Sequence, residues 1–173
     1  MEQISERTPR NAALRGLLAR KSLADARQRA AAARMLGLSE SDVLAIQHLA
    51  WAGALTPGQL GAQLRLTSGG TTALVQRLLR LSYVVREPHP DDRRSTLLRL
   101  TPEAERDAGA LYAPLVGTLD EIAAGLDEDA AAGALDLLDA IAAAAERHAD
   151  ALAHAADAER PRVPRVPAPG LWA

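Results

Sequence analysis

The sequence lacks cysteine and phenylalanine, and it has only four aromatic side chains in 173 residues. Without cysteine, the chain can form no disulfide framework, no thiolate metal site and no thiol redox switch. Four scattered rings also do not build a cofactor site that depends on several stacked aromatics. Its four histidines are not spaced as metal ligands. We therefore expect neither a metal nor a cofactor.

Long apolar runs are absent as well. No stretch reaches the roughly 18 uncharged apolar residues that suggest a membrane-spanning helix. The first residues lack the basic and then apolar order of a secretory signal. The chain also contains no nucleophile elbow, phosphate-binding glycine loop or zinc-protease motif. These absences predict a cytoplasmic protein that is not an enzyme and has no membrane partner.

Charge is present but unevenly distributed, and the net value of −2 hides the contrast. Residues 61–100 carry seven arginines and three acidic side chains, whereas residues 101–160 carry fourteen acidic side chains and three basic ones. A basic middle segment favours a polyanionic partner. A solvated surface explains the same asymmetry, so charge alone leaves both interpretations open.

Hydrophobic spacing predicts a mainly helical chain. A first helix is expected over about residues 7–35, with Gly37 ending it. A second helix is expected to begin at Ser39 and to end at Gly53. Its apolar stripe, which we expect to be buried, consists of Val43, Ile46, Leu49 and Ala50.

Two helices separated by a three-residue turn are predicted next. Thr56 and Gln59 form a capping box around Pro57, which starts a short helix to about residue 64. After the turn at residues 65–67, Thr67 or Ser68 caps a helix to about residue 81. Its inner side is predicted to be Leu74, Val75, Leu78 and Leu79, and its outer side Thr71, Thr72, Gln76, Arg77 and Arg80. This pattern is typical of a helix-turn-helix.

The hydrophobic period then changes from helix to strand. Residues 83–87 and 95–100 predict two short strands, joined by a loop rich in proline and aspartate that ends in Arg93 and Arg94. A hairpin directly after a helix-turn-helix is a wing. Two further helices follow. The apolar stripe of the last one has the spacing of helix-on-helix packing and consists of Leu135, Leu138, Ile141 or Ala142, Ala145, Ala149 and Leu152.

Residues 81–103, with Asp92-Arg93-Arg94 and Leu100-Thr101-Pro102-Glu103, closely resemble the wing of the MarR (multiple antibiotic resistance regulator) family of bacterial transcription factors. Residues 66–78 resemble its recognition helix, and the similarity covers about residues 10–155. Ser82 departs from the pattern, because a glycine commonly stands there. The cysteine of the family's oxidation-sensing branch is missing.

The resemblance implies a homodimer with interlaced terminal helices and two winged domains that bind double-stranded DNA. It also implies a repressor that a small aromatic effector releases from a pseudo-palindromic operator. The fold class is therefore mainly α, a winged helix-turn-helix with N- and C-terminal dimerisation helices and a two-stranded β-wing. The expected divisions are a dimerisation helix at 1–36, the winged domain at 37–101, dimerisation helices at 102–158 and a proline-rich mobile tail at 159–173.

Candidate DNA contacts follow from this arrangement. Thr72 and Gln76 lie one turn apart and are expected to meet base edges, where glutamine pairs well with adenine. Arg94 is expected in the minor groove, with its guanidinium held by Asp92. Ordinary surface side chains and a surface ion pair are the competing interpretations. The full set is Arg65, Thr67, Ser68, Gly69, Gly70, Thr71, Thr72, Gln76, Arg77, Arg80, Arg86, Asp92, Arg93 and Arg94.

Gly69 and Gly70 have two possible roles. They allow backbone amides to approach a phosphate, or they are part of a flexible loop. Arg20, His48, Trp51 and Tyr112 are candidates for an effector pocket. Core packing or surface exposure explains the presence of these side chains equally well. The alternative function is a helical dimer that binds a protein partner and no DNA. It does not explain why seven arginines coincide with the recognition helix and wing.

Overall fold

A computed structural model describes residues 2–92 and 94–158, so Arg93 and the predicted tail lie outside the described residues. The chain forms two compact units, one ending at Val116 and one beginning at Gly117. The predicted divisions at residues 36, 101 and 158 stay a prediction. The elements are α1 (Glu2–Leu36), α2 (Glu40–Ala52), α3 (Pro57–Gln63), α4 (Ser68–Arg80), β1 (Val84–Pro88), β2 (Thr96–Leu100), α5 (Pro102–Ala124) and α6 (Glu128–Ala158).

The start and stop signals of the helices act as the sequence predicts. Ser39 and Thr56 each form a complete capping box, and Thr67 accepts a hydrogen bond from the N–H of Gly70 at 3.2 Å. Gly37 and Gly53 follow the ends of α1 and α2 with φ of 65° and 73°. Glycine adopts this left-handed conformation at little cost, which explains why both helices end there.

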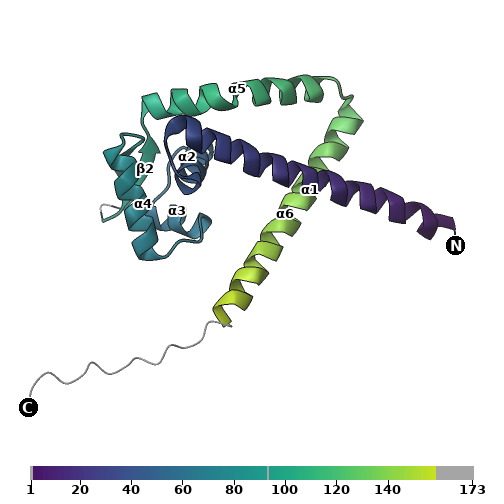
Figure 1. Ribbon diagram of the computed structural model, residues 1–173, viewed down its shortest axis with the longest axis horizontal. Helices are drawn as coiled ribbons and strands as arrows, with labels where there is room; N and C mark the ends of the chain where they lie inside the picture. The colour runs from purple at the N-terminus through teal and green to yellow at the C-terminus, as the bar shows by residue number, and fades with distance from the viewer. Residues whose placement is uncertain (1, 93, 159–173) are drawn as a thin grey trace, which may run out of the picture. The chain divides into compact units, whose positions relative to one another are not determined.

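One hydrophobic core holds the winged domain together. Helices α2, α3 and α4 gather around the hairpin, with α1 leading away from them (Figure 1). Ala45, not the predicted Ala50, continues the buried stripe of α2, because Ala50 lies on the exposed side. Core residues with exposures of 3% or less are Ala45, Ile46, Leu49, Leu60, Leu74, Val75, Leu78, Val84, Leu98 and Ala104.

The wing is an antiparallel hairpin in which Val84 pairs with Leu100 and Pro88 with Thr96. The predicted strand start at Tyr83 is one residue early, because the N–H of Tyr83 donates to the carbonyl of Leu78 at the end of α4. Leu55, which the sequence analysis missed, forms a bridge with Leu98 through N–O distances of 3.2 and 2.8 Å.

Arg99 adds a second tie between the wing and the end of α2. Its Nη1 donates to the carbonyl oxygen of Gly53 at 3.2 Å, and its Nε contacts Glu87 at 2.8 Å. The base of the wing is therefore fixed to the segment that follows α2 by backbone and side-chain bonds together.

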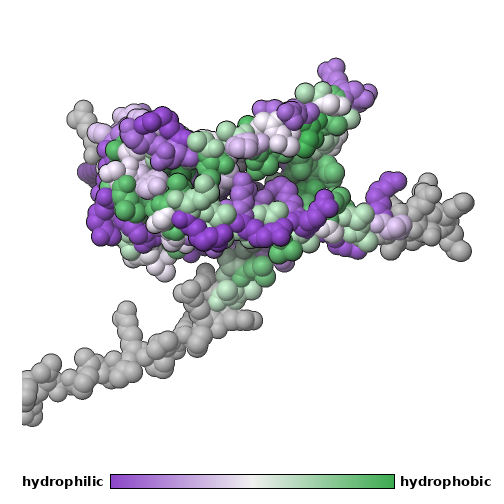
Figure 2. Space-filling model, turned by 45° about the horizontal axis from the view of Figure 1, so that its top comes forward, coloured by the Kyte–Doolittle hydropathy of each residue, from purple (hydrophilic) through white to green (hydrophobic). Residues whose placement is uncertain are grey.

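The helices outside the winged domain have few buried side chains. Helix α1 begins at Glu2 rather than near residue 7, and its buried residues, Ala32 and Ala33, pack on Val43 near its end. Of the described residues from 117 onward, none is buried. Large apolar side chains such as Leu135 (68% exposed) stand at the surface, and Figure 2 shows apolar residues in green among hydrophilic ones on the face in view. Among the described helices, none is both long and apolar enough to cross a membrane.

Candidate nucleic-acid interface

The outer face of α4 carries a straight row of exposed polar side chains. Ser68, Thr72, Gln76 and Arg80 follow one another at intervals of four residues and are all exposed. Leu74, Val75 and Leu78 anchor the opposite side of the helix in the core. The hydroxyl of Thr72 donates to the carbonyl of Ser68 at 2.9 Å, so its oxygen remains able to accept a hydrogen bond. The row therefore presents hydrogen-bonding groups along one edge of a firmly packed helix.

Thr71 does not belong to this row, and the predicted outward orientation is wrong. Its side chain is 7% exposed and faces Gly61 of α3, and its hydroxyl donates to the carbonyl of Thr67 at 3.0 Å. A Cβ on Gly61 would lie 2.3 Å from Oγ1 of Thr71. A glycine at position 61 thus leaves the space that the side chain of Thr71 occupies between α3 and α4.

Arg77, which was also predicted on the outer side, is held by a carboxylate from α2. Its Nη2 donates to Oδ1 of Asp42 at 2.6 Å, and its Nε donates to both carboxylate oxygens at 2.9 and 3.0 Å. Asp42 is 1% exposed, while the side chain of Arg77 retains 38% exposure. The guanidinium is occupied by this pair and fixes α4 against α2.

The same carboxylate closes the first turn of α2. The N–H and the hydroxyl of Ser39 donate to Oδ2 of Asp42 at 3.1 and 2.6 Å. Burial raises the pKa of Asp42, but the hydrogen bonds from Arg77 and Ser39 outweigh burial, so the net pKa lies below its usual value. The hydrogen bond from Arg77 to Asp42 in turn raises the pKa of Arg77. Both groups are therefore charged near neutral pH.

The two glycines at the start of α4 are helical rather than loop slack, because α4 begins at Ser68. Gly70 gives its N–H to the capping Thr67, and an added Cβ there would lie 3.3 Å from Oγ1 of Thr67. Gly69 has open space around it. The N-terminal turn of α4 is thus free of bulky side chains at the point where helix amides attract a phosphate.

The contacts of Asp92 in the wing differ from the prediction. Its Oδ1 accepts from the backbone N–H of Arg94 at 2.9 Å rather than from the guanidinium. The carbonyl of Asp92 accepts from the N–H of Ser95, also at 2.9 Å, and the N–H of Asp91 donates to Nδ1 of His89 at 3.2 Å. Asp92 therefore shapes the turn, and the exposed side chain of Arg94 extends from it.

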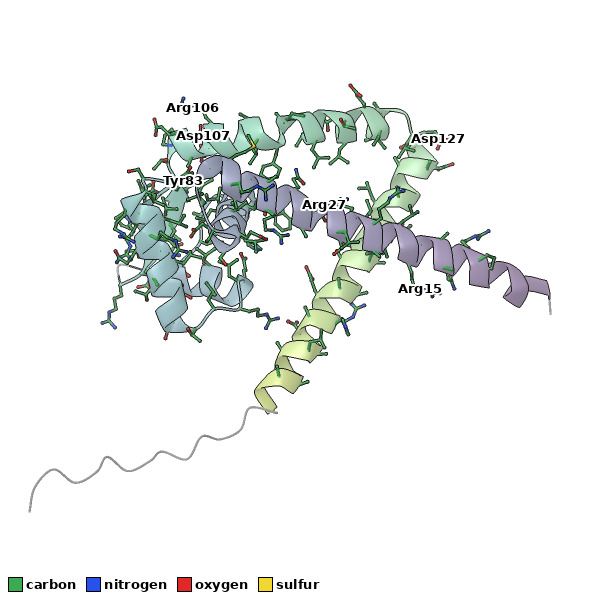
Figure 3. The ribbon with its side chains drawn as sticks, viewed as in Figure 1. Arg15, Arg27, Tyr83, Arg106, Asp107 and Asp127 are labelled. Carbon is green, nitrogen blue, oxygen red and sulfur yellow. The ribbon has the colours of Figure 1, made fainter. Side chains whose placement is uncertain are left out.

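The remaining basic candidates lie in different surroundings. Arg80 and Arg86 are exposed, whereas Arg65 occupies the turn between α3 and α4 with φ of 53°. At the base of the wing, burial and then the charge of Asp107 raise the pKa of the Tyr83 hydroxyl, and Figure 3 marks both residues near the start of α5. Neither residue adds a positive charge to the interface.

The effector pocket assigned to Arg20, His48, Trp51 and Tyr112 stays a prediction. Trp51 is 90% exposed, and Arg20 lines a hollow of about 420 Å³ with Leu23, Arg27 and Glu40, a lining that does not include the other three residues. Tyr112 instead accepts a hydrogen bond from Nε2 of Gln47 at 2.7 Å. Burial raises the pKa of Tyr112, while the nearby charge of Arg29 lowers it.

Sequence reasoning missed Asp42, Gly61, Arg29 and Gln47. The sequence analysis did not single out Asp42, whose partner lies 35 residues away. Nothing local marks such a contact. The glycine at position 61 inside a short helix was an available signal, because an interior glycine often marks a close approach.

Comparisons with known proteins agree with this geometry. A sequence model described as the MarR family matches residues 36–95. An uncharacterized HTH-type transcriptional regulator of Bacillus subtilis, YcgE, is 39% identical over 85 residues, which cover 49% of this chain and 55% of that protein. The multiple antibiotic resistance protein MarR of Salmonella typhimurium is 35% identical over 71 residues, covering 38% of this chain and 49% of that protein.

A solved structure shares the fold at low identity. The crystal structure of transcriptional regulator Tm0710 from Thermotoga maritima has a TM-score of 0.55 and 23% identity, covering 79% of this chain and 96% of that chain. The chain spans about half the length of the curated relatives it matches. The predicted mainly α winged-helix fold is confirmed. Residues 36–95, which form the helix-turn-helix and most of the wing, are the part of the chain that is similar to the MarR family.

Proposed function

We propose that the protein is a dimeric regulator of transcription that binds double-stranded DNA at a specific sequence. One observation carries the proposal: Thr72, Gln76 and Arg80 form an exposed row on a helix whose other side is locked into the core. A helix presented in this way fits the major groove, and a hairpin beside it reaches the next groove. The proposal involves no catalytic step, metal or cofactor, and its place of action is the cytoplasm.

Each side chain has a distinct role in the proposed complex. The amide of Gln76 pairs with an adenine edge through one donor and one acceptor. Arg80 and Arg86 neutralise phosphates, and Arg94 enters the minor groove at the tip of the wing. Arg77 and Thr71 position the recognition helix and contact no base. The guanidinium of Arg77 is bound to Asp42, and the side chain of Thr71 packs against Gly61. The neighbouring Arg93, which lies outside the described residues, stays a candidate from its sequence position alone.

Two copies are needed to read a pseudo-palindromic operator. Half-sites separated by about 10 bp, or a small multiple, place two recognition helices on the same side of the duplex. The large apolar side chains exposed on α5 and α6, such as Ile122 and Leu138 at 59% each, supply a surface for a second copy. Binding by such a dimer next to a promoter blocks transcription, which makes repression the favoured outcome.

Selection of binding sites from a random duplex pool at low salt tests the proposal. We expect an inverted repeat, with specific affinity that falls steeply as salt rises, since each phosphate contact releases about one counterion. Gln76→Ala should relax the preference at one base position by about 1–3 kcal/mol. A dimer that enriches no sequence would overturn the proposal and favour the protein-interaction module instead.

Arg94→Ala provides the test of the wing. It should weaken binding far more than Arg147→Ala, because Arg147 lies on the acidic helix α6. The matched control removes the same charge from a surface that does not face DNA. Equal losses of affinity in the two variants would contradict the placement of the wing in the minor groove.

A small aromatic effector is proposed to act next to Tyr112. Arg29, which lies close enough to lower the pKa of Tyr112, has a buried Nε with no hydrogen-bond partner among the described residues. A carboxylate or phenolate would satisfy that group. Titration of the DNA complex with aromatic acids should release the wild type and leave Arg29→Gln bound. Release of both alike would exclude Arg29 from the effector site.

A further inference from the structure

A hollow of about 460 Å³ lies between α3 and α4 and is called the α3–α4 hollow below. Helix α3 lines it with Pro57 and Ala62, the turn that follows α3 with Leu66, and α4 with Ser68 and Thr72. Ala62, Ser68 and Thr72 are exposed, so the hollow opens at the surface. Ser68 and Thr72 also belong to the exposed row of α4. The hollow therefore adjoins the side of α4 that is proposed to meet the major groove.

The walls of the α3–α4 hollow are uncharged and largely apolar. Pro57, Ala62 and Leu66 supply apolar surface, and none of the described residues that line the hollow carries a charge. Phosphate groups in protein–DNA complexes are commonly bound by arginine, lysine or other hydrogen-bond donors. The hollow offers no cation to a phosphate, and its lining suits an apolar group better.

The two threonines of the lining cannot donate hydrogen bonds into the hollow. The hydroxyl of Thr71 donates to the carbonyl of Thr67 at 3.0 Å, and the hydroxyl of Thr72 donates to the carbonyl of Ser68 at 2.9 Å. A hydroxyl carries one hydrogen, which each threonine has given to its own helix. Towards DNA, Thr72 thus offers a methyl group and an oxygen that accepts.

The edges of the base pairs present one apolar group in the major groove. All the other groups that distinguish the four base pairs there are hydrogen-bond donors or acceptors, and the exception is the 5-methyl group of thymine. Methyl groups of alanine and threonine are among the usual contacts of this group. An apolar hollow that faces the groove therefore matches thymine and no other base. Removing one methyl group from water should favour binding by about fourfold.

We infer that the α3–α4 hollow takes the 5-methyl group of a thymine in each half-site, and that Thr72 and Ala62 determine this preference. The inference rests on the proposed function and deepens it by assigning a base that is selected by shape. Gln76, one turn further along α4, selects its base by hydrogen bonds instead. One side of the recognition helix thus uses two different chemistries for two bases.

Replacement of thymine by deoxyuridine is the first test, and it uses the wild-type chain. Deoxyuridine lacks only the methyl group and still pairs with adenine. Each thymine of the selected operator is replaced in turn, and the dissociation constant is measured by fluorescence anisotropy. At one position in each half-site it should rise by about fourfold. Thymines outside the half-sites serve as controls and should give no change.

The outcomes of this scan separate the inference from the proposed function. An operator that is bound specifically but tolerates deoxyuridine at every position overturns the inference and leaves the proposed function intact. A protein that enriches no sequence from the random pool overturns both.

A methyl group on a different base is the second test. At the sensitive position, the T·A pair is replaced by a C·G pair that carries either cytosine or 5-methylcytosine. The methylated duplex should bind about fourfold more tightly than the unmethylated one, because both place the same hydrogen-bonding groups in the groove. Equal affinities would show that the methyl group is not recognised.

Two substitutions of Thr72 separate its methyl group from its hydroxyl. Thr72→Ser removes the methyl group and should lower the ratio of the deoxyuridine and thymine dissociation constants towards one. Thr72→Val keeps a methyl group and removes the hydroxyl, and the ratio should stay near fourfold. Both duplexes bind the same protein, so any change in stability cancels from the ratio. The opposite pattern would contradict the role of the methyl group.

Filling the hollow is the last test. Ala62 is exposed, so Ala62→Leu should occupy the α3–α4 hollow without disturbing the core and should bring the ratio to about one. Gln63→Leu adds a leucine at the next exposed residue of α3, which does not line the hollow, and should keep the fourfold ratio. Circular dichroism checks that both variants are folded. Equal ratios in the two variants would overturn the inference.

Discussion

The winged domain and the long terminal helices are built in opposite ways. In the winged domain, side chains from α2, α3, α4 and the hairpin form one core, and an ion pair between the buried Asp42 and the partly exposed Arg77 ties α2 to α4. From residue 117 onward, the described chain buries no side chain at all. In proteins, most of the stability of a helix comes from packing its apolar face on a neighbour. The first region has such contacts within its own core, whereas the apolar side chains of the second are left for the proposed dimer to cover.

Truncating one leucine in each region should give the largest contrast. Leu78→Ala removes a fully buried side chain and should lower the free energy of unfolding by about 2–5 kcal/mol at any protein concentration. Leu138→Ala should act mainly by weakening association, so its effect should grow as the protein is diluted. Denaturant titrations at two concentrations measure both. If Leu138→Ala acts independently of concentration, α6 is stabilised within its own chain.

Removing the guanidinium from the buried pair should have the next largest effect. Arg77→Ala leaves the carboxylate of Asp42 buried without its cation and should cost about 3 kcal/mol at pH 7. Because the pKa of Asp42 is lowered in the folded state, the pair stabilises the fold above the unfolded value of about 3.9 and loses this effect as pH falls through the folded value.

Urea unfolding of both proteins between pH 3 and pH 7 checks this prediction. The difference between wild type and Arg77→Ala should shrink towards pH 3, where protonation removes the stranded charge. Arg80→Ala, which removes an exposed arginine of the same helix, serves as the control and should change stability by less than about 0.5 kcal/mol. A difference that is constant with pH would contradict the role of Asp42.

Adding a methyl group between α3 and α4 should lower the free energy of unfolding by a smaller amount. Gly61→Ala places a methyl group 2.3 Å from Oγ1 of Thr71 and should destabilise the domain by about 1–3 kcal/mol. Thr71→Ala removes the obstructing hydroxyl, so the double variant should recover most of the loss. Thermal unfolding of the two single variants and the double variant measures the coupling, and strict additivity would exclude the close contact.

The smallest expected effect is an increase in the free energy of unfolding. Ser82 has φ of 57°, a left-handed conformation that glycine adopts more easily, so Ser82→Gly should stabilise the domain by about 0.5–1 kcal/mol. The control Ser95→Gly, at a residue of the wing without positive φ, should not stabilise. A loss of stability at both positions would indicate that Ser82 is not strained.

The sequence predicts the local features well and the distant contacts poorly. Ser39, Thr56 and Gly53 act within a few residues of their own position, so their roles in starting and ending helices can be read directly from the chain. The orientation of Thr71 and the partner of Arg77 depend on which residues α3 and α2 bring alongside α4. Helical periodicity ranks the sides of a helix by polarity, so it assigns a polar residue that packs against a neighbouring helix, such as Thr71, to the outer side.

The wing shows the same limit. Its two strands and its loop follow from residue types, but the bridge between Leu55 and Leu98 joins segments 43 positions apart. The motif around Asp92 predicts a turn, and the atom that Asp92 contacts is set by the shape of that turn rather than by the motif.

The carboxylate of Asp42 has a consequence for how this protein can change in evolution. One side chain completes the start of α2 and also holds the recognition helix, so a mutation there disturbs two helices at once. Residues 39, 42 and 77 should consequently vary together among homologues. A homologue that lacks the acid at position 42 should have either another partner for the arginine at position 77 or a different residue there.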